Sequence, residues 1–303
     1  MTEDQKERYK RHIVLDGVGA EGQERLLAAS VLIVGAGGLG SPIALYLTAA
    51  GIGRIGIIDA DNVDISNLQR QVIHFTDDRG KSKVESAKEK MSAINPDITV
   101  DAINGFFCKE NAEELIKQYD FIVDATDNFA AKFLINDVCV ALGKPFSHGS
   151  LLRFGGQVFT YVPGSACYRC LFGNEPEAGS MPNSNDAGIL GAVAGIVGTI
   201  QATEVLKYFT QCGSLLTNRL LCIDALTMNF NSIAFSRNAG CRKVAQFKNV
   251  VDHFFFVFID GTIITTGIYH LTDFFFRHCI FFPLNHSAAY FYHQKNIQDH
   301  REN

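Results

Sequence analysis

Long apolar runs, an excess of basic residues and dense cysteine are all missing from this sequence. No uncharged, strongly apolar run reaches the roughly 18–20 residues that span a bilayer. The charged N-terminus, MTEDQKERYKRH, lacks the apolar segment of a secretory signal. A formal net charge of −5 gives no global basic footprint for nucleic acid. Eight cysteines in 303 residues are too sparse for a disulfide scaffold. We therefore expect a reduced, cytoplasmic protein with no membrane or nucleic-acid partner.

The residues that are present are typical of a folded α/β chain. The composition is 47% hydrophobic and 19% charged, which is enough to bury a core. Short β-branched apolar runs alternate with segments of helical pattern, and they lie at residues 31–35, 54–61, 98–103 and 121–126. This alternation predicts a doubly wound, Rossmann-like, mostly parallel sheet. Residues 155–162 and 219–235 follow as strands without helices of that kind between them, which predicts an antiparallel C-terminal extension. Further helices are expected at 81–93, 110–118 and 194–209.

A glycine-rich loop, GAGGLG, follows the first predicted strand and opens a helix. Glycines allow a tight turn there, and the start of the helix presents free N–H groups to phosphate. Asp59 ends the second strand, where a carboxylate can accept the hydroxyls of a ribose. These features fit an NAD enzyme as well as an ATP enzyme, and a tight turn without a ligand is a third interpretation.

The segment after Asp59 favours a triphosphate. Asn67, Gln69 and Arg70 follow the second strand, and Lys83 lies at the next helix. The bridging phosphates of a dinucleotide are served largely by backbone N–H groups, whereas side-chain cations suit the concentrated charge of a triphosphate. Taken singly, Arg70 or Lys83 would be a solvated surface charge. As a set at this position they predict an ATP site.

Four motifs occur in order over residues 5–241, and they are VLIVGAGGLGSP, IDADNVDISNLQRQ, DATDN and CYRC. Together they resemble the E1-like adenylyltransferases of the MoeB/ThiF/HesA family. The resemblance implies an E1-like ThiF fold and a reaction that uses ATP and Mg²⁺. In that reaction the C-terminal glycine carboxylate of a small ubiquitin-fold sulfur carrier (MoaD- or ThiS-like, ending in Gly-Gly) is adenylated and pyrophosphate leaves. The pathway would be molybdopterin or thiamine biosynthesis.

The resemblance also implies site residues. The catalytic set would be Arg11, Arg70, Lys83 and Asp127. The nucleotide-binding set would be Gly35, Gly37, Gly38, Gly40, Asp59, Asp61, Ser66, Asn67, Leu68, Gln69, Arg70, Lys83, Asp127 and Asn128. Asp127 would bind Mg²⁺, and Arg11 would reach the triphosphate from the other protomer of a homodimer. A C-terminal carboxylate has a pKa of about 3.5 and is already ionised at neutral pH, so the chemistry needs no general base.

CYRC supplies Cys167 and Cys170 at the spacing of half a zinc ribbon. The resemblance implies a second such pair, but only Cys241 is present and Val244 replaces the fourth cysteine. Zinc held by three cysteines, zinc with a ligand borrowed from His253 or Cys279, and two reduced core cysteines all stay open. Ser184 stands where some members have a thiol, so no covalent enzyme–carrier adduct is expected.

The remaining cysteines and the histidines are expected to be structural. Cys108, Cys139, Cys212 and Cys222 fall on predicted strands or helices and should be buried. His12, His74 and His148 do not cluster in the sequence, and ordinary structural roles are favoured for each.

The composition changes abruptly near residue 245. Residues 245–303 hold eleven of the 24 phenylalanines and six of the nine histidines, without a regular period. We therefore expect an adenylation domain over 1–244, with a nucleotide-binding part at about 28–145 and a carrier and zinc part at about 146–244. The tail is interpreted as an irregular extension, such as a shifted reading frame gives, in preference to a partner- or metal-binding appendage.

Three other functions were weighed. An E1-like enzyme acting on a tRNA-nucleoside carboxylate is the nearest, and the C-x-x-C pair and the lack of a basic patch weigh mildly against it. An NAD(P)-binding oxidoreductase would leave Arg70, Lys83 and Asp127 unexplained. A non-catalytic partner subunit would not need the intact set of polar residues.

Overall fold

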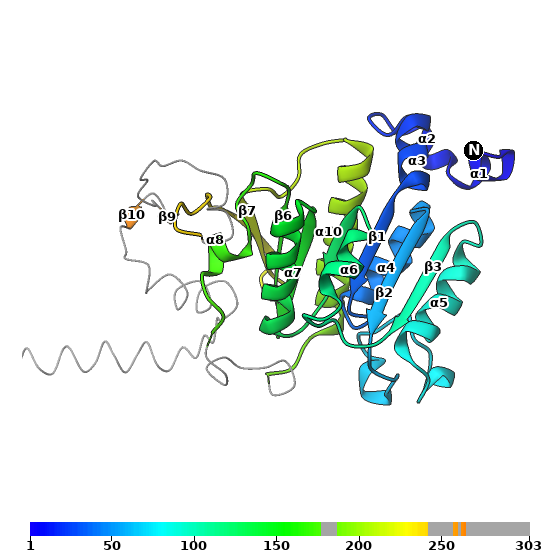
Figure 1. Ribbon diagram of the computed structural model, residues 1–303, viewed down its shortest axis with the longest axis horizontal. Coiled ribbons are helices and arrows are strands. Elements are labelled where there is room, and N and C mark those ends of the chain that lie inside the picture. The colour runs from blue at the N-terminus through cyan, green and yellow to red at the C-terminus, as the bar shows by residue number, and fades with distance from the viewer. Residues whose placement is uncertain (177–186, 242–256, 260–261, 265–303) are drawn as a thin grey trace, which may run out of the picture.

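One continuous sheet organises the molecule (Figure 1). The computed structural model describes residues 1–176, 187–241, 257–259 and 262–264. The strands are β1 (Ser30–Val34), β2 (Arg54–Asp59), β3 (Thr99–Asn104), β4 (Phe121–Asp124), β5 (Phe146–Leu152), β6 (Gly155–Tyr161), β7 (Arg219–Asp224), β8 (Asn229–Ala234), β9 (Val257–Ile259) and β10 (Thr262–Ile264). The first eight form a sheet in the order β3-β2-β1-β4-β5-β6-β7-β8, and β9 pairs with β10 alone.

The sheet is parallel from β3 to β5 and antiparallel from β5 to β8. The predicted doubly wound, mostly parallel sheet with an antiparallel C-terminal extension is therefore confirmed. β5 pairs in parallel with β4 along one edge and antiparallel with β6 along the other, so the sheet continues without a break past residue 145.

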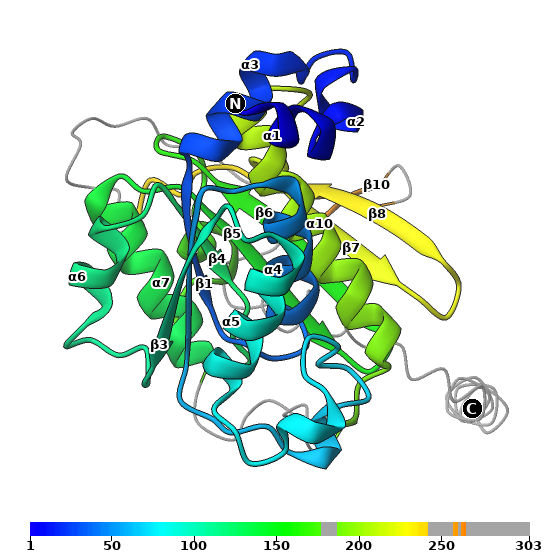
Figure 2. The same ribbon diagram turned by 90° about the vertical axis from the view of Figure 1, so that its right-hand side faces the viewer.

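Helices cover both faces of the sheet (Figure 2). They are α1 (Glu3–Arg8), α2 (Lys10–Ile13), α3 (Gly19–Ala28), α4 (Gly40–Ala50), α5 (Lys83–Ile94), α6 (Ala112–Lys117), α7 (Phe129–Leu142), α8 (Tyr168–Phe172) and α10 (Gly191–Thr210), with short 3₁₀ turns η1 (Ile65–Asn67) and η2 (Thr76–Asp78). Among these described helices, none is both long and apolar enough to cross a membrane.

Strand β1 shows why the sheet needs two covering layers. Val31 and Ile33 join the core on the side of α4 and α10, whereas Leu32 and Val34 join the core on the side of α7. Successive side chains of a strand point to opposite faces, so an unbroken apolar run can be buried only if both faces are covered. This unbroken apolar run is the sequence pattern from which the parallel strands were predicted.

Two strands end two residues before the limits of their predicted segments, and both end at an aspartate. β2 stops at Asp59 rather than residue 61, and β4 stops at Asp124 rather than residue 126. In each case the side-chain carboxylate accepts a hydrogen bond from the backbone N–H two residues further on, at 2.8 Å for Asp59 and 3.1 Å for Asp124. This local turn competes with continuation of the strand.

Some further expectations were incomplete or wrong. The segment 219–235 holds two strands, β7 and β8, joined by a turn, and neither β5 nor α7 was predicted. Cys139 and Cys222 are buried as expected, but Cys108 and Cys212 are half-buried and lie in loops. Cys212 follows Gln211, whose left-handed backbone (φ 59°) ends α10. Cys108 precedes α6, where its N–H donates to the Asn111 side chain at 3.0 Å.

The predictions for the tail can be compared at few positions. Apart from β9 and β10, residues 245–303 lie outside the described residues, as do Ser184 and Val244. The expectations for those positions stay predictions.

Candidate active site

A pocket of about 640 Å³ lies at the carboxyl ends of β1, β2 and β4. The chain builds β1, β2 and β3 outward and then returns to place β4 on the other side of β1. In open α/β sheets, ligands bind where the strand order reverses in this way. Residues predicted to bind nucleotide that line the pocket are Gly35, Gly37, Gly38, Asp59, Asp61, Arg70, Lys83, Asp127 and Asn128.

The glycine loop folds closely onto the ends of the strands. Gly35 has φ of 104°, and a Cβ there would lie 2.7 Å from the carbonyl oxygen of Ala125. A Cβ on Gly40 would lie 2.0 Å from the carbonyl oxygen of Gly35. Only glycine permits these two approaches, so the loop can turn tightly from β1 into α4. Gly40 itself therefore shapes the turn rather than lining the pocket.

Asp59 ties the glycine loop to β2. Its Oδ2 accepts a hydrogen bond from the N–H of Ala36 at 2.8 Å, and its Oδ1 accepts one from the N–H of Asp61 at 2.8 Å. The carboxylate thereby holds the loop against the end of the second strand. This arrangement places a fixed negative group at one end of the pocket, where ribose hydroxyls can donate to it.

Two cationic side chains flank the glycine loop. Lys83, the first residue of α5, is buried and its Nζ donates to Oδ2 of Asp61 at 2.8 Å. Arg70 lies beside Gly38, because a Cβ built on Gly38 would lie 3.5 Å from Cγ of Arg70. The Arg70 guanidinium donates to the carbonyl oxygen of Ser66 at 3.2 Å. An anionic ligand at the loop would therefore meet two positive groups.

Asp127 and Asn128 close the pocket beside β4. The Asn128 side chain accepts from the N–H of Ala131 at 2.9 Å and so caps the start of α7. Asp127 is exposed in the pocket immediately before this cap. A carboxylate oxygen in this place is a ligand of the kind that Mg²⁺ prefers.

Some predicted residues do not line the pocket. Ser66 and Asn67 lie in η1, and Leu68 and Gln69 lie immediately after it. The Asn67 side chain accepts from the N–H of Asp64 at 3.3 Å, which closes that turn. Their contact with a nucleotide stays a prediction.

Arg11 lies far from the pocket of its own chain. The residues immediately before its helix, α2, are held at the C-terminal end of α5, where Arg8 donates to the carbonyl oxygen of Ile94 at 3.0 Å and Asn95 donates to the Tyr9 hydroxyl at 2.8 Å. Figure 1 shows α1 and α2 at the end of the sheet where β1 begins. The residues that line the pocket lie at the other end, where β1, β2 and β4 finish. Any contact of Arg11 with a nucleotide must therefore be made to a second copy of the chain.

Comparison with known proteins agrees with this geometry. Residues 9–243 match the ThiF family profile. The chain belongs to the ThiF family. It is similar to the SAMP-activating enzyme E1 of Haloferax volcanii, with 46% identity over 237 residues that cover 78% of this chain and 88% of that protein. It is also similar to the sulfur carrier protein adenylyltransferase of Thermus thermophilus, with 43% identity over 246 residues that cover 79% and 91%.

A solved structure shows the same architecture. E. coli MccB with ATP matches the fold at a TM-score of 0.66 and 26% identity, over 73% of this chain and 67% of that one. The expected E1-like ThiF fold is confirmed, and this ThiF-family chain is an adenylyltransferase.

A buried charged group, which the sequence pattern did not predict, lies beside the pocket of this ThiF-family chain. Lys132 lines the pocket, and its Nζ lies 3.2 Å from Oδ2 of Asp124 and donates to the carbonyl oxygen of Gly149 at 2.8 Å. His148 Nδ1 donates to the same Asp124 oxygen at 2.7 Å. The available signal was a lysine within an apolar helical run, FAAKFLINDV, which calls for a buried partner.

The charges of this group follow from its surroundings. Burial alone would raise the pKa of Asp124, but the Lys132 ammonium and the hydrogen bond from His148 outweigh it and lower the pKa to about 2. Burial, with the Lys132 charge, lowers the pKa of His148 to about 4. Asp124 is therefore ionised and His148 neutral near pH 7, which fits the structural role expected for this histidine.

Three cysteines of the ThiF-family chain, none of which lines the pocket, lie close together. Sγ of Cys167 lies 3.6 Å from that of Cys170 and 3.8 Å from that of Cys241, and all three sulfurs lie within 4.8 Å of one another. A tetrahedral zinc ion with Zn–S bonds of about 2.3 Å separates its thiolates by about 3.8 Å. The cluster has the spacing to bind a metal ion, and Cys241, some 70 residues away in sequence, joins it as predicted. The suggested fourth ligands, His253 and Cys279, lie outside the described residues.

Proposed function

We propose that this chain uses MgATP to adenylate the C-terminal glycine carboxylate of a small ubiquitin-fold sulfur carrier ending in Gly-Gly. The observation that carries the proposal is the meeting of the glycine loop, Arg70, Lys83 and Asp127 in one pocket at the strand-order reversal. The names of the two relatives, one SAMP-activating and one acting on a sulfur carrier protein, support this class of substrate. A molybdopterin- or thiamine-type carrier is the finer proposal.

The residues of the pocket suit displacement at a phosphoryl group. The incoming carboxylate is ionised at neutral pH, so no residue has to remove a proton from it. The difficulty is the negative charge on the phosphates, and Arg70, Lys83 and the N–H groups of the glycine loop would stabilise it. Asp127 would hold Mg²⁺, which supplies further positive charge to the leaving pyrophosphate. Asp59 would orient the nucleoside through its ribose.

A complete site would require two copies of the chain. Arg11 lies at the opposite end of the sheet from its own pocket, so we propose a homodimer in which Arg11 of each copy reaches the triphosphate held by the other.

The decisive experiment is ATP–pyrophosphate exchange with purified carriers. We expect exchange only with a carrier that keeps its terminal Gly-Gly, and MoaD-like and ThiS-like carriers tested in parallel would separate the two pathways. Exchange driven by tRNA and not by a carrier would favour the alternative substrate. Binding of NAD(P) in place of MgATP would contradict the proposal.

Arg70→Ala should lower the exchange rate by roughly 10²-fold, because one positioned donor to the developing charge is lost. Arg79→Ala is the matched control, since Arg79 is an exposed arginine outside the pocket. Equal rates for the two variants would remove Arg70 from the mechanism.

We also propose that the cysteine cluster holds a structural zinc ion. Purified protein should contain about one zinc per chain, and Cys167→Ser should lose most of it with a fall in Tm of roughly 5 °C or more. Metal analysis and thermal unfolding measure both effects. Cys212→Ser, which removes a thiol outside the cluster, should retain the metal. Unchanged zinc in Cys167→Ser would contradict this proposal.

A further inference from the structure

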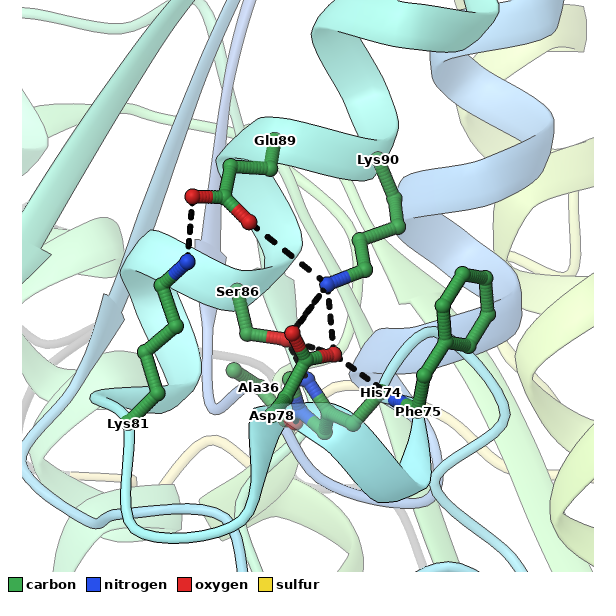
Figure 3. A network of polar contacts seen from close by, with 8 residues as sticks. All are labelled: Ala36, His74, Phe75, Asp78, Lys81, Ser86, Glu89 and Lys90. Carbon is green, nitrogen blue, oxygen red and sulfur yellow. Dashed lines mark hydrogen bonds and ion pairs between the residues drawn. The ribbon is translucent and has the colours of Figure 1, made fainter.

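We propose that His74 positions the Ala36–Gly37 peptide of the glycine loop to receive the phosphates of ATP. His74 lies between Ala36 of the glycine loop and Ser86 of α5, and its buried polar contacts join the two (Figure 3). This inference rests on the proposed function, because it assigns a positioning residue to the same pocket.

The chain of contacts runs from the loop to a buried ion pair. His74 Nε2 lies 2.9 Å from the carbonyl oxygen of Ala36, and Nδ1 lies 2.9 Å from the hydroxyl of Ser86. The Ser86 hydroxyl in turn lies 2.8 Å from Oδ2 of Asp78, which pairs with Lys90. His74 is only 4% exposed and Ser86 is fully buried, so water cannot replace these partners.

The partners of His74 determine which of its nitrogens carries the proton. A carbonyl oxygen can only accept, so Nε2 must be protonated to bond Ala36. Nδ1 of a neutral His74 can then only accept, and the one proton of the Ser86 hydroxyl can go either to Nδ1 or to Oδ2 of Asp78. Asp78 does not depend on that hydroxyl, because the N–H of Phe75 donates to it at 2.8 Å and Lys90 contacts both of its oxygens. The hydrogen bond from Nε2 to Ala36 is therefore compatible with a neutral histidine.

The charge state of His74 agrees with this arrangement. Burial lowers the pKa of His74, and the charges of Lys83 and Lys90 lower it further. The hydrogen bond to Ala36 and the Asp78 carboxylate act in the opposite direction. The net shift is downward, so the neutral form prevails near pH 7.

Both polar groups of Ala36 are held by side chains. Its N–H donates to Asp59 and its carbonyl oxygen accepts from His74. The peptide from Ala36 to Gly37 is trans, so the N–H of Gly37 points opposite to that carbonyl, away from His74. Gly37 lines the pocket, and this N–H is therefore directed to where a phosphate oxygen would lie.

The same series of contacts also fixes the position of α5, which carries Lys83. Ser86 and Lys90 lie on α5, whose first residue is Lys83. A shift of α5 would therefore move Lys83 and the glycine loop together. His74 holds the N–H donors and the ammonium group in one fixed relation.

Two variants of His74 separate positioning from packing. His74→Leu keeps a side chain of similar size without a donor, and we expect its Kd for MgATP to rise about tenfold, comparable with the loss of one hydrogen bond. Its affinity for adenosine, which has no phosphate, should change less than about twofold. His74→Gln keeps an N–H donor for Ala36 and should recover most of the MgATP affinity. Isothermal titration calorimetry with MgATP and with adenosine measures each.

The control variant is Lys81→Ala. It removes the exposed Lys81–Glu89 pair seen in Figure 3, which does not touch His74, and it should leave both affinities unchanged. Equal MgATP affinity in wild type and His74→Leu, or a parallel fall in adenosine affinity, would overturn the inference.

A second measurement tests His74 without any nucleotide. In ¹⁵N-histidine-labelled protein, His74 should show the neutral tautomer protonated at Nε2, and the opposite tautomer would overturn the inference even if His74→Leu fails to fold. Failure of wild type to bind MgATP would instead contradict the proposed function, while the tautomer result would still decide the contact with Ala36.

Discussion

Asp127→Ala should abolish ATP–pyrophosphate exchange, with a loss of roughly 10³-fold or more, while the chain still folds. Asp127 is exposed in the pocket beyond β4, so its side chain is not part of the core. In the proposed function its carboxylate would hold Mg²⁺ against the phosphates, and alanine offers no oxygen in its place. Exchange at saturating carrier measures the loss, and thermal unfolding should show stability within about 0.5 kcal/mol of wild type.

Asp77→Ala is the matched control for this prediction. Asp77 is an exposed aspartate in η2 that does not line the pocket, and its removal changes the net charge equally. Normal exchange by Asp127→Ala would exclude this residue from the mechanism. A large fall in Tm for that variant would instead indicate a structural role.

Asp124→Asn should lower the free energy of unfolding by about 3–5 kcal/mol. Asp124 is 1% exposed and accepts from Lys132, His148 and Thr126. An amide has nearly the same shape but no charge, so the Lys132 ammonium would stay buried without its counter-ion. Urea unfolding followed by circular dichroism measures the change.

Two further variants test this explanation. Adding Lys132→Met to Asp124→Asn removes the unpaired charge and should recover part of the lost stability. Glu113→Gln breaks an exposed pair with Lys117, 2.6 Å apart, and should change stability little. A loss below about 1 kcal/mol for Asp124→Asn would show that the buried pair is not required for folding.

The parallel strands could be predicted because their residues carry the information locally. Runs such as Val31–Val34 are apolar on both faces, and burial on both faces is what a doubly wound sheet provides. β5 could not be predicted in this way. Polar residues interrupt its apolar pattern, and their contacts are with residues distant in the sequence: His148 bonds Asp124, and the backbone carbonyl oxygen of Ser147 accepts from Gln201 at 3.2 Å.

Part of the candidate site could also be predicted, because it depends on the order of the parallel strands along the sequence. Asp59, Lys83 and Asp127 follow parallel strands, and the carboxyl ends of parallel strands lie at one edge of a sheet, so sequence order alone brings them together. The pairing of Lys132 with Asp124 depends on how α7 packs against β4, which no local pattern encodes. In the proposed homodimer, the approach of Arg11 to a pocket would depend on a second copy of the chain.

The double role of β5 limits how this enzyme can be divided. A fragment ending near residue 145 would lose β5, and β4 would become an outer strand with unsatisfied backbone groups. Phe121, Ile122 and Val123 are fully buried in the whole protein, so the exposed edge would also be strongly apolar. Such a fragment should self-associate, and evolution could exchange the nucleotide-binding half between proteins only together with the strands that shield it.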